Sequence, residues 1–246
     1  QAGVDHPLEL ALTSLSRLMT YGFSQAEALP LVEKAQYLIA SSRGAQIFKR
    51  REARGVISTG STSLNNILGG GVKTGLVTDF FGESGAGKTQ IAFQLCVNTI
   101  LPKDQGGLEA GPLFIDTVGT FRPERIAEMV EARGLRREAV LEKIIVSEVR
   151  TLEEQVKLPR KVKDLSTSRR LGLMIIDTLT ENFLQTYGGE EGVIQRQSLL
   201  GAHLHDLALL ALRNDMAVVV TNTVRAKMSD AREVIEIGGN TVAQGL

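Results

Sequence analysis

Residues 77–89 read Val-Thr-Asp-Phe-Phe-Gly-Glu-Ser-Gly-Ala-Gly-Lys-Thr, and this stretch decides the fold. Its first residues are apolar enough for a buried strand, and from Gln90 onward the apolar pattern indicates a helix. Between them stands Gly-x-x-x-x-Gly-Lys-Thr, the spacing of a phosphate-binding loop in its expected strand–loop–helix context. A glycine-rich turn that matches by accident is the competing interpretation, and the full pattern in this context disfavours it.

Each residue type in the loop has a chemical reason to be there. The glycines let backbone N–H groups converge on one point, and the start of the helix adds the positive end of its dipole. Lys88 supplies a mobile charge for the terminal phosphates, and the Thr89 hydroxyl can ligate Mg²⁺. The sequence therefore predicts a nucleoside triphosphate site. Its loop residues are Gly82, Glu83, Ser84, Gly85, Ala86, Gly87, Lys88, Thr89 and Gln90.

Composition narrows the class of protein. The chain has 246 residues, and its 28 basic side chains equal its 28 acidic ones, so bulk charge attracts neither nucleic acid nor acidic lipid. A single cysteine, Cys96, excludes a disulfide within the chain and favours a reducing intracellular compartment. No apolar run reaches membrane-spanning length, so we expect no membrane partner.

Strand and helix patterns alternate after residue 57. Near-continuous apolar runs at 113–116, 144–146, 171–176 and 217–221 predict buried parallel strands, and periodic stretches between them predict helices. We expect a helix over 152–164, broken or kinked at Pro159, and a long one over 195–213. The fold class is α/β, with a mostly parallel sheet flanked by helices.

Three segments follow from these patterns. Residues 1–40 are expected to form a small helical segment, 41–56 a linker, and 57–246 the nucleotide-binding core. In the first segment Ser24 is a plausible helix N-cap. Two apolar sets predict its buried faces: Leu8, Leu10, Leu12, Leu15 and Leu18, then Ala26, Leu29, Leu31, Ala35 and Leu38.

Asp177 is the second candidate element of the nucleotide site. It ends a buried strand, where its carboxylate can face the phosphate loop and hold Mg²⁺ directly or through water. An acidic residue that ends a strand for solubility alone is the alternative. Beside a complete phosphate loop the functional interpretation is favoured, so Thr89 and Asp177 are the predicted metal-site residues.

Taken together, the motifs resemble those of the RecA/RadA-type recombinases, specifically the archaeal and eukaryotic branch. The segments that carry the resemblance are Ser58-Thr59-Gly60-Ser61-x-x-Leu64, Leu68-Gly69-Gly70-Gly71, the phosphate loop, Asp116-Thr117, Phe121-Arg122-Pro123-Glu124-Arg125, Ile175-Ile176-Asp177, His203-Leu204-His205-Asp206-Leu207, Val220-Thr221-Asn222 and Gly238-Gly239. The resemblance implies a RecA-like core that binds ATP and Mg²⁺ and acts in homologous recombination and DNA repair.

It also implies further contacts. Single-stranded DNA would meet two loops, at about 184–195 and 227–237, where Arg225, Lys227 and Arg232 are the candidate DNA-binding residues. Arg125 would lie over the adenine. The expected protein partner is a recombinase or paralogue protomer.

The departures from the family pattern concern hydrolysis first. The family's Asp-Thr-Glu reads Asp116-Thr117-Val118, so the glutamate that activates the attacking water is missing. Asp116 would lie about 6–7 Å back along the strand, too far to reach the same water. The family's Thr-Asn-Gln reads Thr221-Asn222-Thr223, so the glutamine that couples the terminal phosphate to the second DNA loop is missing too.

Assembly and DNA contact also differ. The first DNA loop carries Glu190 and Glu191 and no base before Arg196, and acidic residues there repel phosphate. The linker's Phe-x-x-Ala reads Ser42-Arg43-Gly44-Ala45, so the aromatic anchor is gone. The chain stops soon after Gly239, and we expect the family's C-terminal strands to be missing.

Two functions remain open from the sequence. The first is an active DNA-dependent ATPase that forms filaments on single-stranded DNA and exchanges strands, which the family identity favours. The second is an accessory paralogue that binds ATP but hydrolyses it weakly. The joint loss of the water-activating glutamate, the coupling glutamine, the arginines of the first DNA loop and the linker phenylalanine favours it. We prefer the second. A KaiC-like signalling ATPase shares the core but does not explain the Phe121–Arg125 and His203–Leu207 motifs.

Overall fold

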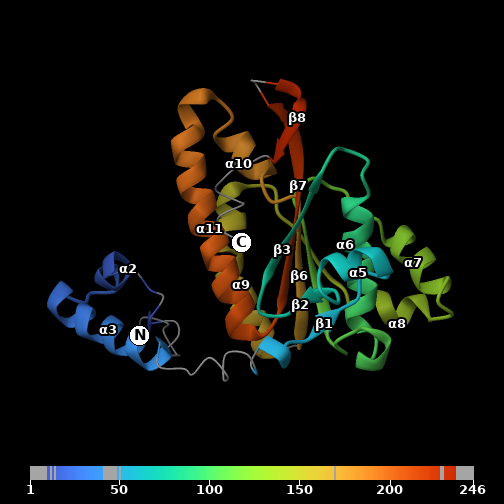
Figure 1. The fold of residues 1–246 in the computed structure, drawn as a ribbon, viewed down its shortest axis with the longest axis horizontal. Coiled ribbons are helices and arrows are strands. Elements are labelled where there is room, and N and C mark those ends of the chain that lie inside the picture. The colour runs from blue at the N-terminus through green and yellow to red at the C-terminus, as the bar shows by residue number, and fades with distance from the viewer. Residues whose placement is uncertain are drawn as a thin grey trace. The chain divides into compact units, whose positions relative to one another are not determined.

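The computed structural model describes residues 10–11, 13, 15–40, 49, 51–168, 170–227 and 230–236. The chain divides into two compact units, residues 1–54 and residues 55–246 (Figure 1). Each unit has its own apolar core, and each is described by itself below.

The first unit pairs two helices. Helix α2 covers Leu15–Thr20 and helix α3 covers Gln25–Ala40. The Glu27 carboxylate accepts hydrogen bonds from the Ser24 backbone N–H (3.0 Å) and hydroxyl (2.7 Å), the return half of a capping box. The apolar set predicted for α3 was partly wrong, because Leu29 and Leu31 are 40% and 41% exposed. The buried stripe is instead Ala28, Val32 and Ala35, spaced four and three residues apart on one helical face.

The second unit is built on a parallel sheet. Its strands are β3 (Val77–Gly82), β4 (Gly111–Asp116), β5 (Ile145–Glu148), β6 (Leu171–Asp177) and β7 (Ala217–Lys227). Their spatial order is β3-β7-β6-β4-β5, with every pairing parallel. Strand β8 (Asp230–Glu236) pairs antiparallel with the far end of β7. This sheet and its helices confirm the predicted α/β class with a mostly parallel sheet.

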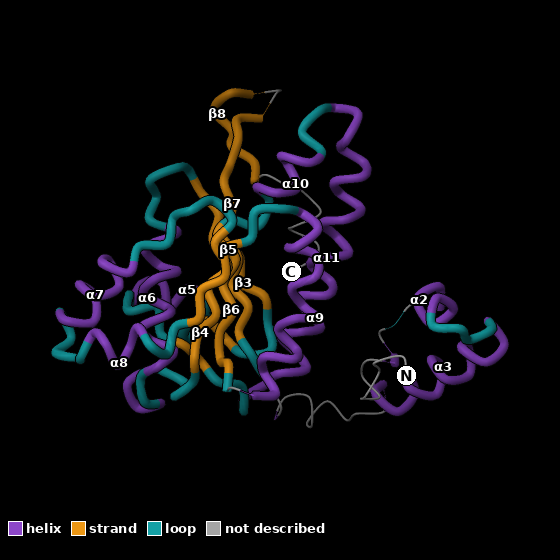
Figure 2. Tube along the Cα trace, turned by 180° about the vertical axis from the view of Figure 1, so that it is seen from behind, coloured by secondary structure: helices purple, strands orange, loops and turns teal. Residues whose placement is uncertain are grey.

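Helices cover both faces of the sheet (Figure 2). Along β6, Leu173 and Ile175 face one layer while Met174 and Ile176 face the other, because strand side chains alternate. The first layer consists of α6 (Lys88–Ile100), α7 (Pro123–Glu131) and α8 (Arg137–Leu141). The second consists of α9 (Leu152–Ser168), α10 (Glu181–Thr186) and α11 (Val193–Asn214). Double coverage explains why the strand sequences are continuously apolar, since neither face meets water.

A small ribbon precedes the sheet. It joins β1 (Val56–Ile57) to β2 (Val72–Lys73) across helix α5 (Thr62–Ile67). The Asn65 amide organises the turn before α5, since its oxygen accepts from the Thr59 backbone (2.8 Å) and its nitrogen donates to the Ser58 hydroxyl (2.9 Å). A side chain at Gly71 would meet the Ile57 carbonyl oxygen at 2.4 Å, so this close approach requires glycine. The Ser-Thr-Gly-Ser and Leu-Gly-Gly-Gly motifs therefore stabilise the turn before α5 and the close approach of β1 and β2.

Several element boundaries differ from those that the sequence predicts. Helix α9 runs unbroken through Pro159, because burial of Leu158 and Val162 against the sheet offsets the one hydrogen bond that proline cannot make. Strand β7 is longer than the predicted 217–221, since its last residues pair with β8 beyond the sheet. Two short 3₁₀ turns, Lys103–Gln105 and Glu190–Gly192, complete the described elements. None of the described helices is both long enough and apolar enough to cross a bilayer.

Candidate nucleotide site

Four parallel strands bring the predicted site residues to one edge of the sheet. Asp116 pairs with Asp177 across β4 and β6, and Gly82 pairs with Thr223 across β3 and β7. Loops that follow the carboxyl ends of such strands are where open α/β sheets bind ligands. A cavity of about 400 Å³ lies at this edge. It is lined by Ser84, Gly85, Gly87, Lys88, Thr89, Gln90, Val118, Thr120, Asp177, Thr178 and Thr223.

The phosphate loop has the backbone that its sequence predicts. Gly85 and Gly87 have φ angles of 83° and 90°, in the left-handed region that other residues avoid. A Cβ at either position would meet no atom within 4 Å, so it is the backbone conformation and not crowding that requires glycine. Gly87 caps α6, whose free N–H groups therefore start at the cavity. The Lys88 amine donates to the carbonyls of Gly82 (2.9 Å) and Glu83 (2.8 Å), which holds the cation against the loop.

Asp177 is the buried carboxylate of the cavity, with only 1% of its surface exposed. Its Oδ2 accepts hydrogen bonds from the hydroxyls of Thr89 (2.9 Å) and Thr120 (3.0 Å), and its Oδ1 accepts one from the Thr221 hydroxyl. A carboxylate beside a threonine hydroxyl is the hard oxygen donor set that suits Mg²⁺. The donor chemistry therefore fits the metal that the sequence predicts for Thr89 and Asp177.

Val118, which follows β4, also lines the cavity. Its side chain is 39% exposed and apolar, so it can neither take a proton nor orient a water. Asp116 does not substitute for a carboxylate at 118. Its oxygens accept the backbone N–H groups of Val118 (3.1 Å), Gly119 (2.6 Å), Thr120 (3.1 Å) and Phe121 (3.0 Å). The Asp116 carboxylate therefore stabilises the turn at 118–121 through these hydrogen bonds.

Those contacts also decide the protonation of Asp116. Burial alone would raise the pKa of its carboxyl, but the four N–H donors together lower that pKa below its ordinary value of 3.8. The group is therefore ionised at neutral pH. An ionised acceptor with all its partners in the backbone is a structural cap and not a general base.

Thr223 also lines the cavity, and it pairs with Gly82 across β3 and β7. Its backbone N–H donates to the Asn222 amide oxygen (3.1 Å), which also accepts from the Thr180 hydroxyl (2.6 Å). Asn222 thereby connects β7 to the loop after β6, close to α10. The short Thr223 side chain ends at the cavity wall, whereas the family pattern has a longer amide at this position.

The remaining predicted site residues lie beside the cavity. The Arg125 guanidinium donates to the Gln90 side-chain oxygen (2.8 Å) and pairs with Glu128 (2.6 Å), so it stands next to the start of α6 but does not line the cavity. Gly82, Glu83 and Ala86 form the outside of the loop, where the Ala86 N–H donates to the Glu83 carbonyl (3.2 Å). Placement over an adenine stays a prediction for Arg125.

The predicted DNA contacts are placed only in part. Arg225 and Lys227 lie on β7 and Arg232 on β8, in an antiparallel ribbon where the sequence predicts a loop. Their side chains lie outside the described residues, as do residues 42–45 and 237–246. The first predicted DNA loop, 184–195, includes the end of α10, a 3₁₀ turn and the start of α11.

Sequence reasoning missed Thr120, Thr178 and Thr221 as members of the site. Thr120 and Thr221 contact Asp177 from 57 and 44 residues away, so no local spacing could reveal them. The Thr117 hydroxyl holds the backbone of Thr178 in place, since it accepts a hydrogen bond from the Thr178 N–H (2.7 Å) and donates one to the Thr178 carbonyl (2.9 Å). Pairing of β4, β6 and β7 is what brings these hydroxyls together.

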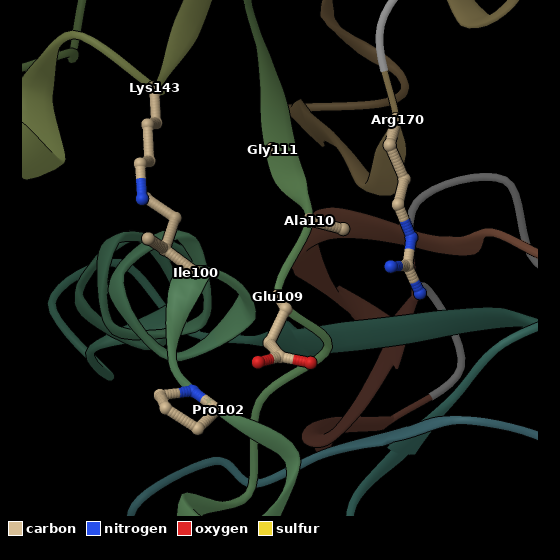
Figure 3. Close-up of a pocket in the computed structure, with 7 residues that line it drawn as sticks. All are labelled: Ile100, Pro102, Glu109, Ala110, Gly111, Lys143 and Arg170. Carbon is tan, nitrogen blue, oxygen red and sulfur yellow. The ribbon is translucent and has the colours of Figure 1, made fainter.

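A second cavity, of about 390 Å³, lies at the opposite edge of the sheet, where β4, β5 and β6 begin (Figure 3). Lys143 and Arg170 extend into it on either side of Gly111, and Glu109 lies between them. No predicted site residue lines this cavity.

Comparison with known proteins agrees with this architecture. The model of the family described as Rad51 matches residues 50–245. The chain is also similar to the DNA repair and recombination protein RadA of Metallosphaera sedula, with 36% identity over 243 residues. That alignment covers 94% of this chain and 75% of the RadA protein.

Proposed function

Because this chain belongs to the Rad51 family of RecA/RadA-type recombinases, we propose that it acts in homologous recombination and DNA repair as an ATP-binding accessory paralogue with weak hydrolysis. Within such a role, nucleotide binding would set the shape or partner affinity of the protein, and turnover would contribute little.

Support for binding comes from the loop side of the cavity. The residues that would bind the phosphates and the metal lie close together there. They are the left-handed glycines Gly85 and Gly87, the start of α6, Lys88, Thr89 and Asp177. Thr89 and Asp177 would hold Mg²⁺, and Lys88 would exchange its two carbonyl partners for phosphate oxygens. Mg²⁺, when bound, supplies charge neutralisation for the phosphates. The residues themselves bind and orient the nucleotide.

Support for weak hydrolysis comes from one observation: among the described residues that line the cavity, only Asp177 has a carboxylate, and three threonine hydroxyls already engage it. Val118 occupies the position of the family's water-activating glutamate, and Asp116 is engaged by four backbone N–H groups. A positioned base contributes roughly 10²- to 10⁴-fold in such reactions, so its loss leaves slow turnover.

The protein partner we propose is a recombinase or paralogue protomer. A chain that binds ATP without efficient hydrolysis would stay in its nucleotide-bound form and could stabilise a neighbouring active subunit. Glu190 and Glu191, in the first candidate DNA loop, disfavour tight independent binding of single-stranded DNA.

Steady-state ATP turnover with and without single-stranded DNA, together with size analysis for filaments, tests the proposal. We expect measurable ATP affinity, little phosphate release and no long filaments. Brisk turnover that DNA stimulates, accompanied by filaments, would instead identify an active recombinase, the function favoured by family membership.

A further inference from the structure

We propose that Thr120 is a positioning residue that holds the Asp177 carboxylate in place for a bound metal–nucleotide, an inference that rests on the proposed nucleotide site. Thr120 lines the cavity, and its hydroxyl donates to Asp177 Oδ2 across 3.0 Å. Neither the phosphate-loop motif nor the strand-end aspartate includes this residue.

The arrangement of donors around Asp177 gives Thr120 a role separate from that of Thr89. Both hydroxyls reach Oδ2, at 3.0 Å and 2.9 Å, while Thr221 holds Oδ1. Thr89 is itself a predicted metal-site residue, so its hydroxyl must adjust when Mg²⁺ binds. Thr120 belongs to the turn after β4 and not to the phosphate loop, so its bond to Oδ2 does not depend on a change at Thr89.

The turn that carries Thr120 is rigid for an independent reason. Its backbone N–H donates to Asp116 Oδ1 (3.1 Å), and its neighbours Gly119 and Phe121 donate to the same carboxylate. The β-branched threonine side chain also has few rotamers. Asp116 therefore fixes the turn, the turn fixes the Thr120 hydroxyl, and that hydroxyl fixes the orientation of Asp177.

This chain of contacts predicts an effect that depends on Mg²⁺. Without the Thr120 hydroxyl, Asp177 Oδ2 keeps only the Thr89 hydroxyl of its two threonine donors, and that hydroxyl is the one that must adjust when Mg²⁺ binds. Binding of a nucleotide with Mg²⁺ should weaken, whereas binding without the metal depends on the loop and should hardly change. Thr120→Val removes the hydroxyl at nearly constant shape, and Thr120→Ser keeps it.

The test is isothermal titration of the full chain with a non-hydrolysable ATP analogue, with MgCl₂ or with EDTA. For Thr120→Val we expect about tenfold weaker affinity in MgCl₂, the size of one hydrogen bond to a charged group, and less than about twofold change in EDTA. Thr120→Ser should restore most of the metal-dependent affinity. Thr99→Val is the matched control, because it removes a buried threonine hydroxyl, bonded to the Leu95 carbonyl (2.7 Å), at the far end of α6.

The outcomes separate the two proposals. If the wild-type protein fails to bind the analogue in MgCl₂, the nucleotide site and the role of Thr120 both fall. If the wild-type protein binds and Thr120→Val binds equally well, or weakens equally in MgCl₂ and EDTA, the positioning role alone falls. A thermal melt of each variant shows whether it is folded. If Thr120→Val does not fold, Thr120→Ser is compared with the wild type instead. Equal Mg²⁺ dependence of binding in the two proteins supports the positioning role, and loss of that dependence in Thr120→Ser overturns it.

Discussion

The two sides of the nucleotide cavity differ in what their side chains can do. The loop side presents a cation, a hydroxyl and, at its edge, the Asp177 carboxylate, each with hydrogen-bond partners that hold it in place. The other lining residues that concern hydrolysis, called the other side below, are Val118 and Thr223, whose side chains are apolar or short. Binding a triphosphate needs only the first side, whereas cleaving it also needs a positioned water. From this difference we propose that binding and turnover are separable in this fold.

The largest expected effect is on the loop side. Lys88→Ala should weaken ATP binding at least about 100-fold, because the terminal phosphates lose their mobile positive charge. Titration calorimetry with MgCl₂ measures it. Lys143→Ala, at the second cavity, is the control and should bind normally. Unchanged affinity in Lys88→Ala would contradict the phosphate-loop assignment.

A substitution on the other side should make the two sides more alike. Val118→Glu is expected to raise ATP turnover roughly tenfold to hundredfold, because it restores a carboxylate where water must be oriented. Phosphate release under saturating ATP is the measurement, and Val118→Leu, which adds bulk without a base, should show no gain. If Val118→Glu also shows none, the deficiency extends beyond this residue, with Thr223 as the next position to restore.

Asp116 offers a check on which carboxylates are structural. Asp116→Asn should lower the free energy of unfolding by about 2 kcal/mol, because the amide nitrogen cannot accept the N–H bonds that the carboxylate holds. Urea denaturation with an unchanged m-value would report it. Asp104→Asn, an exposed aspartate in a 3₁₀ turn, should cost little. A loss of nucleotide turnover at unchanged stability would instead make Asp116 a reacting group.

The same substitution has a pH dependence. The folded-state pKa of Asp116 lies below the ordinary 3.8, so its contribution to stability is present above 3.8 and is lost as the pH falls through the lowered value. The difference between wild type and Asp116→Asn should therefore persist at neutral pH and shrink only in strong acid.

The smallest expected effect concerns communication with DNA. Thr223→Gln in a Val118→Glu background should let single-stranded DNA change ATP turnover by about fivefold, the lower range of coupling between sites, because the longer amide can span from the cavity toward the β7–β8 ribbon. Thr223→Val in the same background is the control. Equal DNA stimulation in all three proteins would show that the coupling does not run through position 223.

Much of the site was predictable from the sequence, and the reason is local geometry. Residues 77–89 carry strand, loop and helix in one continuous segment, so spacing alone predicts that Lys88 and Thr89 begin the helix after the loop, as they do in α6. Position 118 was predictable as well, since it lies two residues after Asp116 in a segment with a family pattern. Pro159 was misleading, because local sequence shows the lost hydrogen bond but not the burial that offsets it.

By itself, then, the sequence determined the fold class, the phosphate loop and the absence of a glutamate at position 118, all of which depend on residues close together in the chain. The tertiary structure decided which groups hold Asp177 and what Asp116 does. Thr120 and Thr221 reach Asp177 from other segments, and the turn at 118–121 folds back onto Asp116. Such contacts depend on strand order and register, which bring distant residues within hydrogen-bonding distance and leave no periodic trace in the sequence.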